Sequence, residues 1–288
     1  MTDTMQGKII LITGANSGIG KETAVALARA GATVVFTSRD PQKGEQAAAD
    51  IRQRSGADVA LMPLDLASFP SIRALADGFL QRYEQLHVLI NNAGLILTER
   101  TETEQGFETT FGVNHLGHFL LTQLLLDRIK ASAPARIINV ASNAHRFARG
   151  GLDFDDLHLT KSYGGMQAYG RSKLANIYFT RELARRLEGS GVTVNAVHPG
   201  GVATGFARDG DVKPPFSWFW TIASPFLRSP EKGAQTSIFL ASSPELDGVT
   251  GKYFANSKET QPTSIAQDDE AVRRLWTASE ELIAQTDA

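Results

Sequence analysis

Two residues capable of acid–base chemistry stand four positions apart in the segment AYGRSKLAN, at positions 168–176. Tyr169 carries a phenol and Lys173 an ammonium group, and on a helix this spacing puts both on one face, about 5–6 Å apart at Cβ. Such a pair can give a proton to a substrate oxygen or take one from it, provided that the phenol pKa, near 10 when free, falls by about 3 units. A cation about 4 Å away at an effective dielectric near 20 contributes about 4 kcal/mol, which is enough for that shift. The structural alternative is that the two residues merely share a helix face.

The glycine-rich segment TGANSGIG predicts a second chemistry, the binding of a phosphate group. Its glycines, Gly14, Gly18 and Gly20, allow a tight turn and let a pyrophosphate approach the backbone N–H groups that open a helix. Because the segment lies between the first predicted strand and a helix, it is typical of a dinucleotide-binding turn and less so of a plain structural one.

The end of the second predicted strand indicates which dinucleotide is bound. An NAD-binding protein commonly has a carboxylate here for the ribose 2′-hydroxyl. This chain has Ser38 and Arg39 instead, and a guanidinium suits a 2′-phosphate. The alternative is an exposed Arg39 paired with Asp40. The pattern therefore favours NADP(H) over NAD(H).

The elements that would position these residues alternate along almost the whole chain. Apolar, β-branched runs predict seven strands, at 8–13, 33–38, 58–66, 86–94, 135–142, 191–200 and 251–256. Amphipathic patterns predict helices between them, at about 17–30, 41–55, 68–83, 104–131, 165–189 and 230–242. This alternation indicates an α/β protein, a doubly wound Rossmann fold with a seven-stranded parallel sheet and helices on both faces. No linker divides the sequence, so we expect a single domain over 1–288, with an irregular insertion near 201–229 and a last helix near 268–285.

Composition excludes several other classes of protein. The 288 residues are 42% hydrophobic and 21% charged, with a net charge of −2 and scattered basic residues, which disfavours a nucleic-acid partner. There is no cysteine, so disulfides, thiolate metal sites and cysteine nucleophiles are excluded. The N-terminal MTDTMQGK has no apolar signal region, and the apolar runs are too short for a transmembrane segment. We therefore expect a cytoplasmic protein.

Several motifs together resemble the short-chain dehydrogenase/reductase family over almost the whole chain. They are TGANSGIG, NNAG at 91–94, VNHLGHF at 113–119, INVASNAH, YGRSK and HPGGVATG at 198–205. The retinol-dehydrogenase-like branch is the most similar, through GFETTFGVNHLGHFLLTQLLL, SKLANIYFTRELARRLEGSGVTVNAVHPG, EKGAQTS and RRLW. The resemblance implies an NADP(H)-dependent oxidoreductase that acts on a lipophilic aldehyde, ketone or alcohol of the retinal type.

The same resemblance implies a catalytic set of Asn114, Ser142, Tyr169 and Lys173. Tyr169 would be the general acid or base, Ser142 would bond the substrate oxygen, and Asn114 would hold a water linking the lysine to solvent. The structural alternatives are that Ser142 caps a strand end and that Asn114 is an amide bonded to the main chain inside a helix. The cofactor contacts implied by the motifs are Gly14, Asn16, Ser17, Gly18, Ile19, Gly20, Ser38, Arg39, Asp65, Leu66, Asn91, Ala93, Gly94, Tyr169, Lys173, Pro199, Gly200, Val202 and Thr204.

Some residues depart from the family pattern or have a plainer explanation. Gly170 and Arg171 stand where small or apolar residues are usual, and we expect Arg171 to point to solvent. His115 and His118 lie three apart on a helix without a third metal ligand nearby, so no metal site is predicted. The pair Asp155/Asp156 is typical of a solvated loop, and we expect a structural role for His198 at a strand end.

The segment PPFSWFWTIASPFL, at 214–227, holds two of the three tryptophans and three phenylalanines. It is predicted to be an apolar lid over a lipophilic substrate, in contact with a peripheral membrane surface or a second subunit; the alternative is an ordinary covered helix. The resemblance also implies a homo-oligomer that pairs through the helices at 104–131 and 165–189. Two other functions fit parts of the pattern: a non-catalytic NADP(H)-sensing or scaffold protein, and a protochlorophyllide-type reductase.

Overall fold

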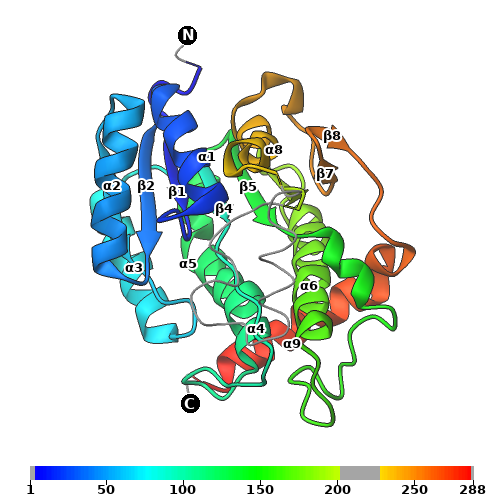
Figure 1. Cartoon of the computed structure of the whole chain (residues 1–288). Helices are drawn as coiled ribbons and strands as arrows, with labels where there is room; N and C mark the ends of the chain where they lie inside the picture. Colours follow the sequence, from blue (N-terminus) through cyan, green and yellow to red (C-terminus); the bar gives the residue numbers. More distant parts are fainter. Residues whose placement is uncertain (1–3, 202–227, 287–288) are drawn as a thin grey trace.

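One mixed sheet forms the centre of the molecule (Figure 1). The computed structural model describes residues 4–201 and 228–286. The strand order is β3-β2-β1-β4-β5-β6-β7-β8, and all neighbours are parallel except β7 and β8. The strands are β1 (Ile9–Ile12), β2 (Thr33–Ser38), β3 (Val59–Pro63), β4 (Val88–Asn91), β5 (Ala135–Val140), β6 (Val192–His198), β7 (Tyr253–Ala255) and β8 (Lys258–Glu259). The predicted doubly wound fold is confirmed.

The seven predicted parallel strands are all present, and the sheet has one further short strand, β8, which is antiparallel. Asn256 and Ser257 have φ angles of 55° and 56°, which gives the two-residue turn of a tight hairpin. The turn brings β8 back antiparallel to β7, with Ala255 opposite Lys258. A two-residue strand has no hydrophobic period, so the sequence pattern could not reveal it.

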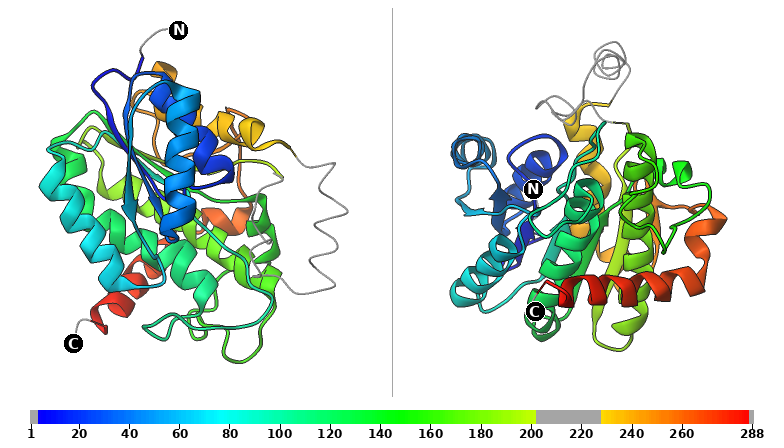
Figure 2. Two further views of the ribbon diagram at one scale, coloured as in Figure 1. Left: turned by 60° about the vertical axis from the view of Figure 1, so that its left-hand side comes forward. Right: turned by 90° about the horizontal axis from the view of Figure 1, so that it is seen from below.

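Each face of the sheet carries its own helices, because successive side chains of a strand point to opposite sides. Ile10 and Ile12 of β1 pack in one buried cluster and Leu11 in the other. The first face is covered by α1 (Gly18–Arg29), α2 (Pro41–Ser55) and α8 (Pro230–Ser242), and the second by α3 (Phe69–Arg82), α5 (Gly117–Ala131) and α6 (Gly165–Arg186). Figure 2 shows these layers from two further directions.

The predicted helix at 104–131 begins later than expected. Gly106, with a φ of 81°, makes a turn in which the Thr103 N–H donates to the Phe107 carbonyl at 2.8 Å. The buried Glu108 carboxylate then caps the next segment by accepting from the N–H groups of Thr110 and Phe111. The helix consists of α4 (Thr109–Phe111), a π-helical stretch (Gly112–Leu116) and α5.

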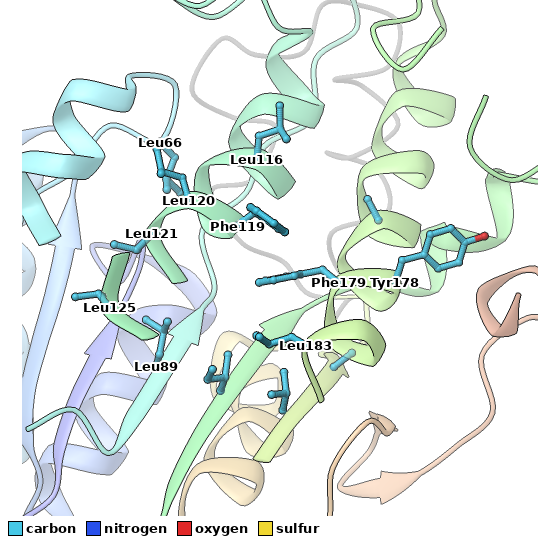
Figure 3. Close-up of a cluster of buried hydrophobic side chains, with 14 of the residues drawn as sticks. Leu66, Leu89, Leu116, Phe119, Leu120, Leu121, Leu125, Tyr178, Phe179 and Leu183 are labelled. Carbon is cyan, nitrogen blue, oxygen red and sulfur yellow. The ribbon is translucent and has the colours of Figure 1, made fainter. Parts of the chain in front are cut away.

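The last helix, α9 (Asp269–Ala284), packs across α5 and α6 (red in Figure 2). The rings of Phe119 and Phe179 face each other between α5 and α6, with centroids 5.3 Å apart (Figure 3). Trp276 of α9 lies 4.9 Å from Phe119 and 6.1 Å from Phe179. Helix α9 therefore covers part of the two helices through which the sequence predicts pairing between copies. Over the two described ranges, no helix is long and apolar enough to cross a bilayer.

Candidate active site

A cleft of about 270 Å³ opens at the carboxyl ends of the parallel strands. Strands β1 and β4 are neighbours although they are not consecutive, so the chain switches sides here, which is where ligands bind in open α/β sheets. The predicted cofactor residues that line the cleft are Gly14, Asn16, Ser17, Gly18, Ile19, Gly20, Ser38, Arg39, Asp65, Leu66, Ala93 and Gly94. Pro199 and Gly200 do not line it. Val202, Thr204 and the segment 214–227 lie outside the described residues.

The glycine turn packs closely against the segment that follows β4. A Cβ on Gly14, whose φ is 65°, would lie 2.8 Å from Ala93 Cβ. A Cβ on Gly20 would lie 2.5 Å from Asn92 Nδ2. The side chain of Ser17, at the N-cap of α1, makes no hydrogen bond to the first turn. The turn thus brings backbone N–H groups and the positive end of a helix to the cleft wall, so these residues fit a dinucleotide.

The tip of β2 supplies positive charge to the cleft. Arg39 is exposed and forms no ion pair with Asp40, which instead caps α2 by accepting from the Lys43 N–H at 3.0 Å. The pairing of Arg39 with Asp40, which was the structural alternative, is therefore not formed. Lys43 also lines the cleft, and the sequence analysis missed it because it lies in the first turn of α2 and not at a strand end. The other lining residues that it missed are Thr37, Asp40, Leu64, Asn92, Leu95 and Val113.

Asn91 does not face the cleft as the motif implied. Its side chain is buried, and Nδ2 donates to Thr122 Oγ1 at 3.0 Å and to Asn139 Oδ1 at 2.8 Å. The residue therefore ties β4 to α5 and β5. Asn92 lines the cleft in its place and donates through Nδ2 to the Thr13 carbonyl at 2.8 Å.

The four candidate catalytic residues come from three separate parts of the chain and meet beside the cleft. Ser142 follows β5 and is hydrogen-bonded to Tyr169 of α6. Lys173, one helical turn further on, lies with Nζ 5.5 Å from the centre of the Tyr169 ring. Nζ donates to the Val140 carbonyl at 2.9 Å, and a Cβ on Gly94 in the cleft wall would lie 3.3 Å from it. The arrangement brings a proton donor, a hydroxyl and a cation to one edge of the cleft.

Burial shifts the pKa values of both Tyr169 and Lys173. Burial raises the pKa of Tyr169, and the hydrogen bond with Ser142 offsets only part of the rise. Burial also lowers the pKa of Lys173 to about 7. The expectation from the sequence that Lys173 lowers the Tyr169 pKa is therefore not met, since burial of the phenol is the largest effect on its pKa. A protonated phenol is the form that can act as a general acid.

Asn114 lies in the π-helical stretch between the cleft and Lys173. Its Oδ1 accepts from the Leu95 N–H at 2.8 Å, and its Nδ2 donates to the Leu95 carbonyl and to Ser172 Oγ, both at 2.9 Å. The two bonds to Leu95 are the main-chain bonds expected if Asn114 has a structural role. The buried amide thus holds the loop after β4 against α6, so it fixes the distance between the cleft wall and α6.

The two departures from the family pattern have structural explanations. Arg171 is buried, contrary to the prediction, and its guanidinium donates to the carbonyls of Asp153 and Asp156 at 3.0 and 2.9 Å. Asp156 is buried too, and its carboxylate accepts from the N–H groups of Thr160 and Lys161, which lower its pKa to about 2. The predicted solvated loop is wrong for Asp156, because Arg171 and this turn enclose it.

Gly170 allows α6 to pack closely against the turn that follows β5. A Cβ at this position would lie 2.7 Å from the Ala144 carbonyl oxygen and 3.0 Å from Phe147 Cβ. Both atoms belong to the turn that begins at Ser142. The missing side chain therefore sets how closely Tyr169 and Ser142 approach each other.

We expect Gly170→Ala to lower kcat by about 10-fold or more, because a shift near 1 Å in catalytic geometry has effects of this order. Helix propensity alone would make the variant more stable by about 1 kcal/mol. Gly165→Ala is the steric control on the same helix, since its Cβ would meet the Leu97 carbonyl at 2.3 Å and not the turn that begins at Ser142. Steady-state kinetics and thermal unfolding of both variants provide the measurement. Unchanged kcat in Gly170→Ala would show that the turn accommodates a methyl group.

His115 and His118 are buried structural histidines. His118 Nδ1 donates to the Asn114 carbonyl at 3.1 Å, and Nε2 accepts from Thr13 Oγ1 at 2.9 Å. His115 Nε2 is bonded to Ser279 of α9 at 2.9 Å. Burial lowers the pKa of His115 to about 3 and that of His118 to about 4. In the part of the chain that the structure describes, no group of three or more possible ligands is arranged to hold a metal ion.

These two histidines should make the fold acid-sensitive. Their folded pKa values lie below the ordinary value of 6.5, so their contribution to stability is complete above pH 6.5 and is lost as pH falls toward 4. Between pH 6.5 and 5, each should lower the free energy of unfolding by about 2 kcal/mol. Urea unfolding over this range measures the effect before carboxylates titrate, and His118→Gln should reduce the slope. A free energy of unfolding that stays constant from pH 7 to 5 would contradict it.

The fold and the cleft together define an α/β protein with a dinucleotide-binding type of site at the switch point of a doubly wound sheet. A family model described as enoyl-(acyl carrier protein) reductase matches residues 14–256. Retinol dehydrogenase 12 of Mus musculus is 49% identical over 278 residues, covering 96% of this chain and 86% of that protein. The chain belongs to the short-chain dehydrogenase/reductase family and is an alcohol/carbonyl oxidoreductase.

Solved structures agree with this assignment. The chain resembles an uncharacterised protein from Mycobacterium paratuberculosis, with a TM-score of 0.75 and 34% identity over 98% of this chain and 97% of that one. It also resembles a short-chain dehydrogenase from Shigella flexneri in complex with NADP, with a TM-score of 0.69 and 25% identity over 90% and 100% of the two chains. A nicotinamide cofactor is therefore expected in the cleft.

Proposed function

We propose that this protein reduces a lipophilic aldehyde or ketone with NADPH, or oxidises the corresponding alcohol, with Tyr169 as general acid or base. The main observation behind the proposal is that Tyr169, Ser142 and Lys173 lie close together beside the cleft that the glycine turn lines. When bound, the nicotinamide exchanges a hydride with the substrate carbon. The chain's own groups must then bind the oxygen, supply its proton and exclude water.

Three side chains would share the work at the substrate oxygen. Tyr169, protonated because burial raises its pKa, donates its proton to the oxygen as negative charge develops there. The Ser142 hydroxyl bonds the same oxygen and stabilises that charge. Lys173 lies behind the ring, and with a pKa near 7 it is partly protonated at neutral pH, so it can stabilise the tyrosinate that remains.

NADP(H) is supported over NAD(H) by the charge at the tip of β2. Arg39 and Lys43 both line the cleft near the position expected for the ribose 2′-group. The NADP-bound relative from Shigella flexneri is consistent with this choice. The main chain after β6, at Pro199 and Gly200, would approach the nicotinamide.

A substrate of the retinal type is supported by the names of the similar proteins, several of which are retinol dehydrogenases. The apolar composition of 214–227 favours a lipophilic substrate as well. A cytoplasmic location, a peripheral membrane contact and a homo-oligomer are further parts of this proposal. Fractionation of cells that express the chain, and light scattering of the purified protein, test them.

The proposed activity is tested by incubating the purified protein with aldehydes and ketones of increasing apolarity, including all-trans-retinal, with NADPH and NADH in parallel. Turnover with NADPH that rises with apolarity is the expected result. Binding of NADPH without turnover of any carbonyl would instead favour the sensor or scaffold function. Activity on protochlorophyllide alone would favour the second alternative enzyme.

A further inference from the structure

Several side chains hold the turn after β5 that carries Ser142. Ser142 caps a 3-10 helix (Asn143–Phe147), and its Oγ accepts from the Ala144 N–H at 3.1 Å. The Ser142 carbonyl accepts twice from one residue, from the His145 N–H at 3.1 Å and from His145 Nδ1 at 2.7 Å. His145 thus fixes the main chain of the residue whose hydroxyl meets Tyr169.

The bonds of His145 define the position of its proton. A carbonyl oxygen can only accept, so Nδ1 carries the hydrogen in its bond to Ser142. Nε2 is then unprotonated and accepts from the Thr263 N–H at 3.1 Å. The ring is 1% exposed, and its burial lowers its pKa, which favours this neutral form. His145 therefore links the Ser142 turn to the segment that follows β8.

Neighbouring groups hold the ring and the turn in place. The ring of Tyr253 packs edge-on against His145 with centroids 5.5 Å apart. The Tyr253 hydroxyl donates to Asn143 Oδ1 at 3.1 Å, and the Asn143 N–H donates to His198 Nδ1 at 3.3 Å. His198 therefore has the structural role that was expected. Arg146 is the nearby cation that acts on His145, and it too disfavours an imidazolium.

The segment after β8 is in turn fixed to the catalytic helix. The hydroxyl of Tyr178 on α6 donates to the Ile265 carbonyl at 2.9 Å, and the Arg181 guanidinium donates to the Ala266 carbonyl at 2.9 Å. Helix α6 carries Tyr169 and Lys173. A continuous path thus runs from α6 through residues 263–266 and His145 to the main chain of Ser142.

We propose that His145 is a positioning residue for Ser142, and that the segment 263–266 acts through it to hold the serine hydroxyl at the right distance from Tyr169. The inference rests on the proposed role of Ser142 in the reaction. Its physical basis is that a hydroxyl must be held within about 0.5 Å of its productive position to stabilise charge on a substrate oxygen. His145 does not line the cleft, and it bonds the carbonyl of Ser142 and not its hydroxyl.

The substitution Thr263→Pro removes the hydrogen bond that joins the segment 263–266 to His145. Thr263 has a φ of −61°, which a proline ring adopts, and its side chain makes no capping bond. Thr263→Pro therefore deletes the N–H with little change of conformation, and Thr263→Ala, which keeps the N–H, is the matched control. We expect kcat to fall about 10-fold in Thr263→Pro and to change less than about twofold in Thr263→Ala, with the Kd for NADPH unchanged in both.

His145→Asn tests the same link from the other side. Its amide can still donate to the Ser142 carbonyl in place of Nδ1 but does not reach Thr263, so it should lose as much kcat as Thr263→Pro. Circular dichroism and thermal unfolding show whether both variants are folded. Equal kcat in Thr263→Pro, Thr263→Ala and the natural chain would overturn the proposal.

Combining these changes with Ser142→Ala separates positioning from general structural damage. If His145 acts through Ser142, Thr263→Pro should cause no further loss of kcat once the hydroxyl is absent. A multiplicative loss in the double variant would mean that the segment supports the site by another route. If Ser142→Ala alone leaves kcat unchanged, the proposed function fails at Ser142, and that result is distinct from a failure of the link.

Discussion

Replacement of Tyr169 by phenylalanine is expected to lower kcat for carbonyl reduction by at least about 10²-fold, because it removes the general acid. The aromatic ring stays, so its packing over Lys173, with Nζ 5.5 Å from the ring centre, is kept. NADPH should therefore bind with nearly unchanged Kd. The measurement is steady-state kinetics on the best substrate of the aldehyde and ketone series, together with a fluorescence titration of NADPH.

The pH dependence of the residual activity distinguishes loss of the acid from loss of structure. Reduction by the natural chain should decline when the Tyr169 proton is lost at high pH, whereas the phenylalanine variant has no such group. Tyr83→Phe, which makes the same change at the end of α3 and outside the cleft, is the control. Turnover of Tyr169→Phe within a few-fold of the natural chain would remove Tyr169 from its proposed role.

Most of the cleft could be predicted because its residues follow strands directly. In a parallel sheet the carboxyl ends lie along one edge, so Gly14, Arg39 and Asp65 gather there whatever the details of packing. Lys43 could not be found in this way. Its position depends on where α2 starts, which is set by the Asp40 cap and Pro41.

The direction of individual side chains was harder to predict. In NNAG, Asn91 is the last residue of a strand that is buried on each face and Asn92 follows it, so no polar alternation tells which one points inward. The structure turns Asn91 into the protein and leaves Asn92 at the cleft. Arg171 is similar, because the carbonyls that it binds, at Asp153 and Asp156, come from a loop with no periodic pattern.

Gly170 and His145 show what single-sequence reasoning cannot provide. Both residues contact segments that are distant in the sequence and that only the folded chain brings close. The absence of a Cβ at Gly170 matters because the Ala144 carbonyl lies close to that position. His145 matters because its ring accepts a hydrogen bond from Thr263, which is 118 positions away in the sequence. The combined motifs thus indicated the candidate catalytic residues, whereas the residues that hold them in place became visible only in three dimensions.

Arg39→Ala is expected to weaken NADPH binding about 10- to 100-fold and NADH binding by less than about threefold. The reason is that a guanidinium bond to a phosphate contributes about 1.5–3 kcal/mol, whereas a ribose hydroxyl gains little from it. Lys43→Ala should have a smaller effect of the same sign, because an ammonium acts as a point charge without the paired geometry of a guanidinium. Kd values for both cofactors, measured by fluorescence at fixed ionic strength, provide the test.

The ratio of the two Kd values is the decisive quantity, since general damage to the cleft would weaken both cofactors alike. Arg82→Ala removes the same charge from the exposed end of α3, outside the cleft, and should leave the ratio unchanged. Added salt should reduce the preference of the natural chain for NADPH, because Arg39 is exposed and its attraction to the phosphate is screened. Equal losses for NADPH and NADH in Arg39→Ala would place the 2′-phosphate elsewhere, and Lys43 would then be the first residue to test.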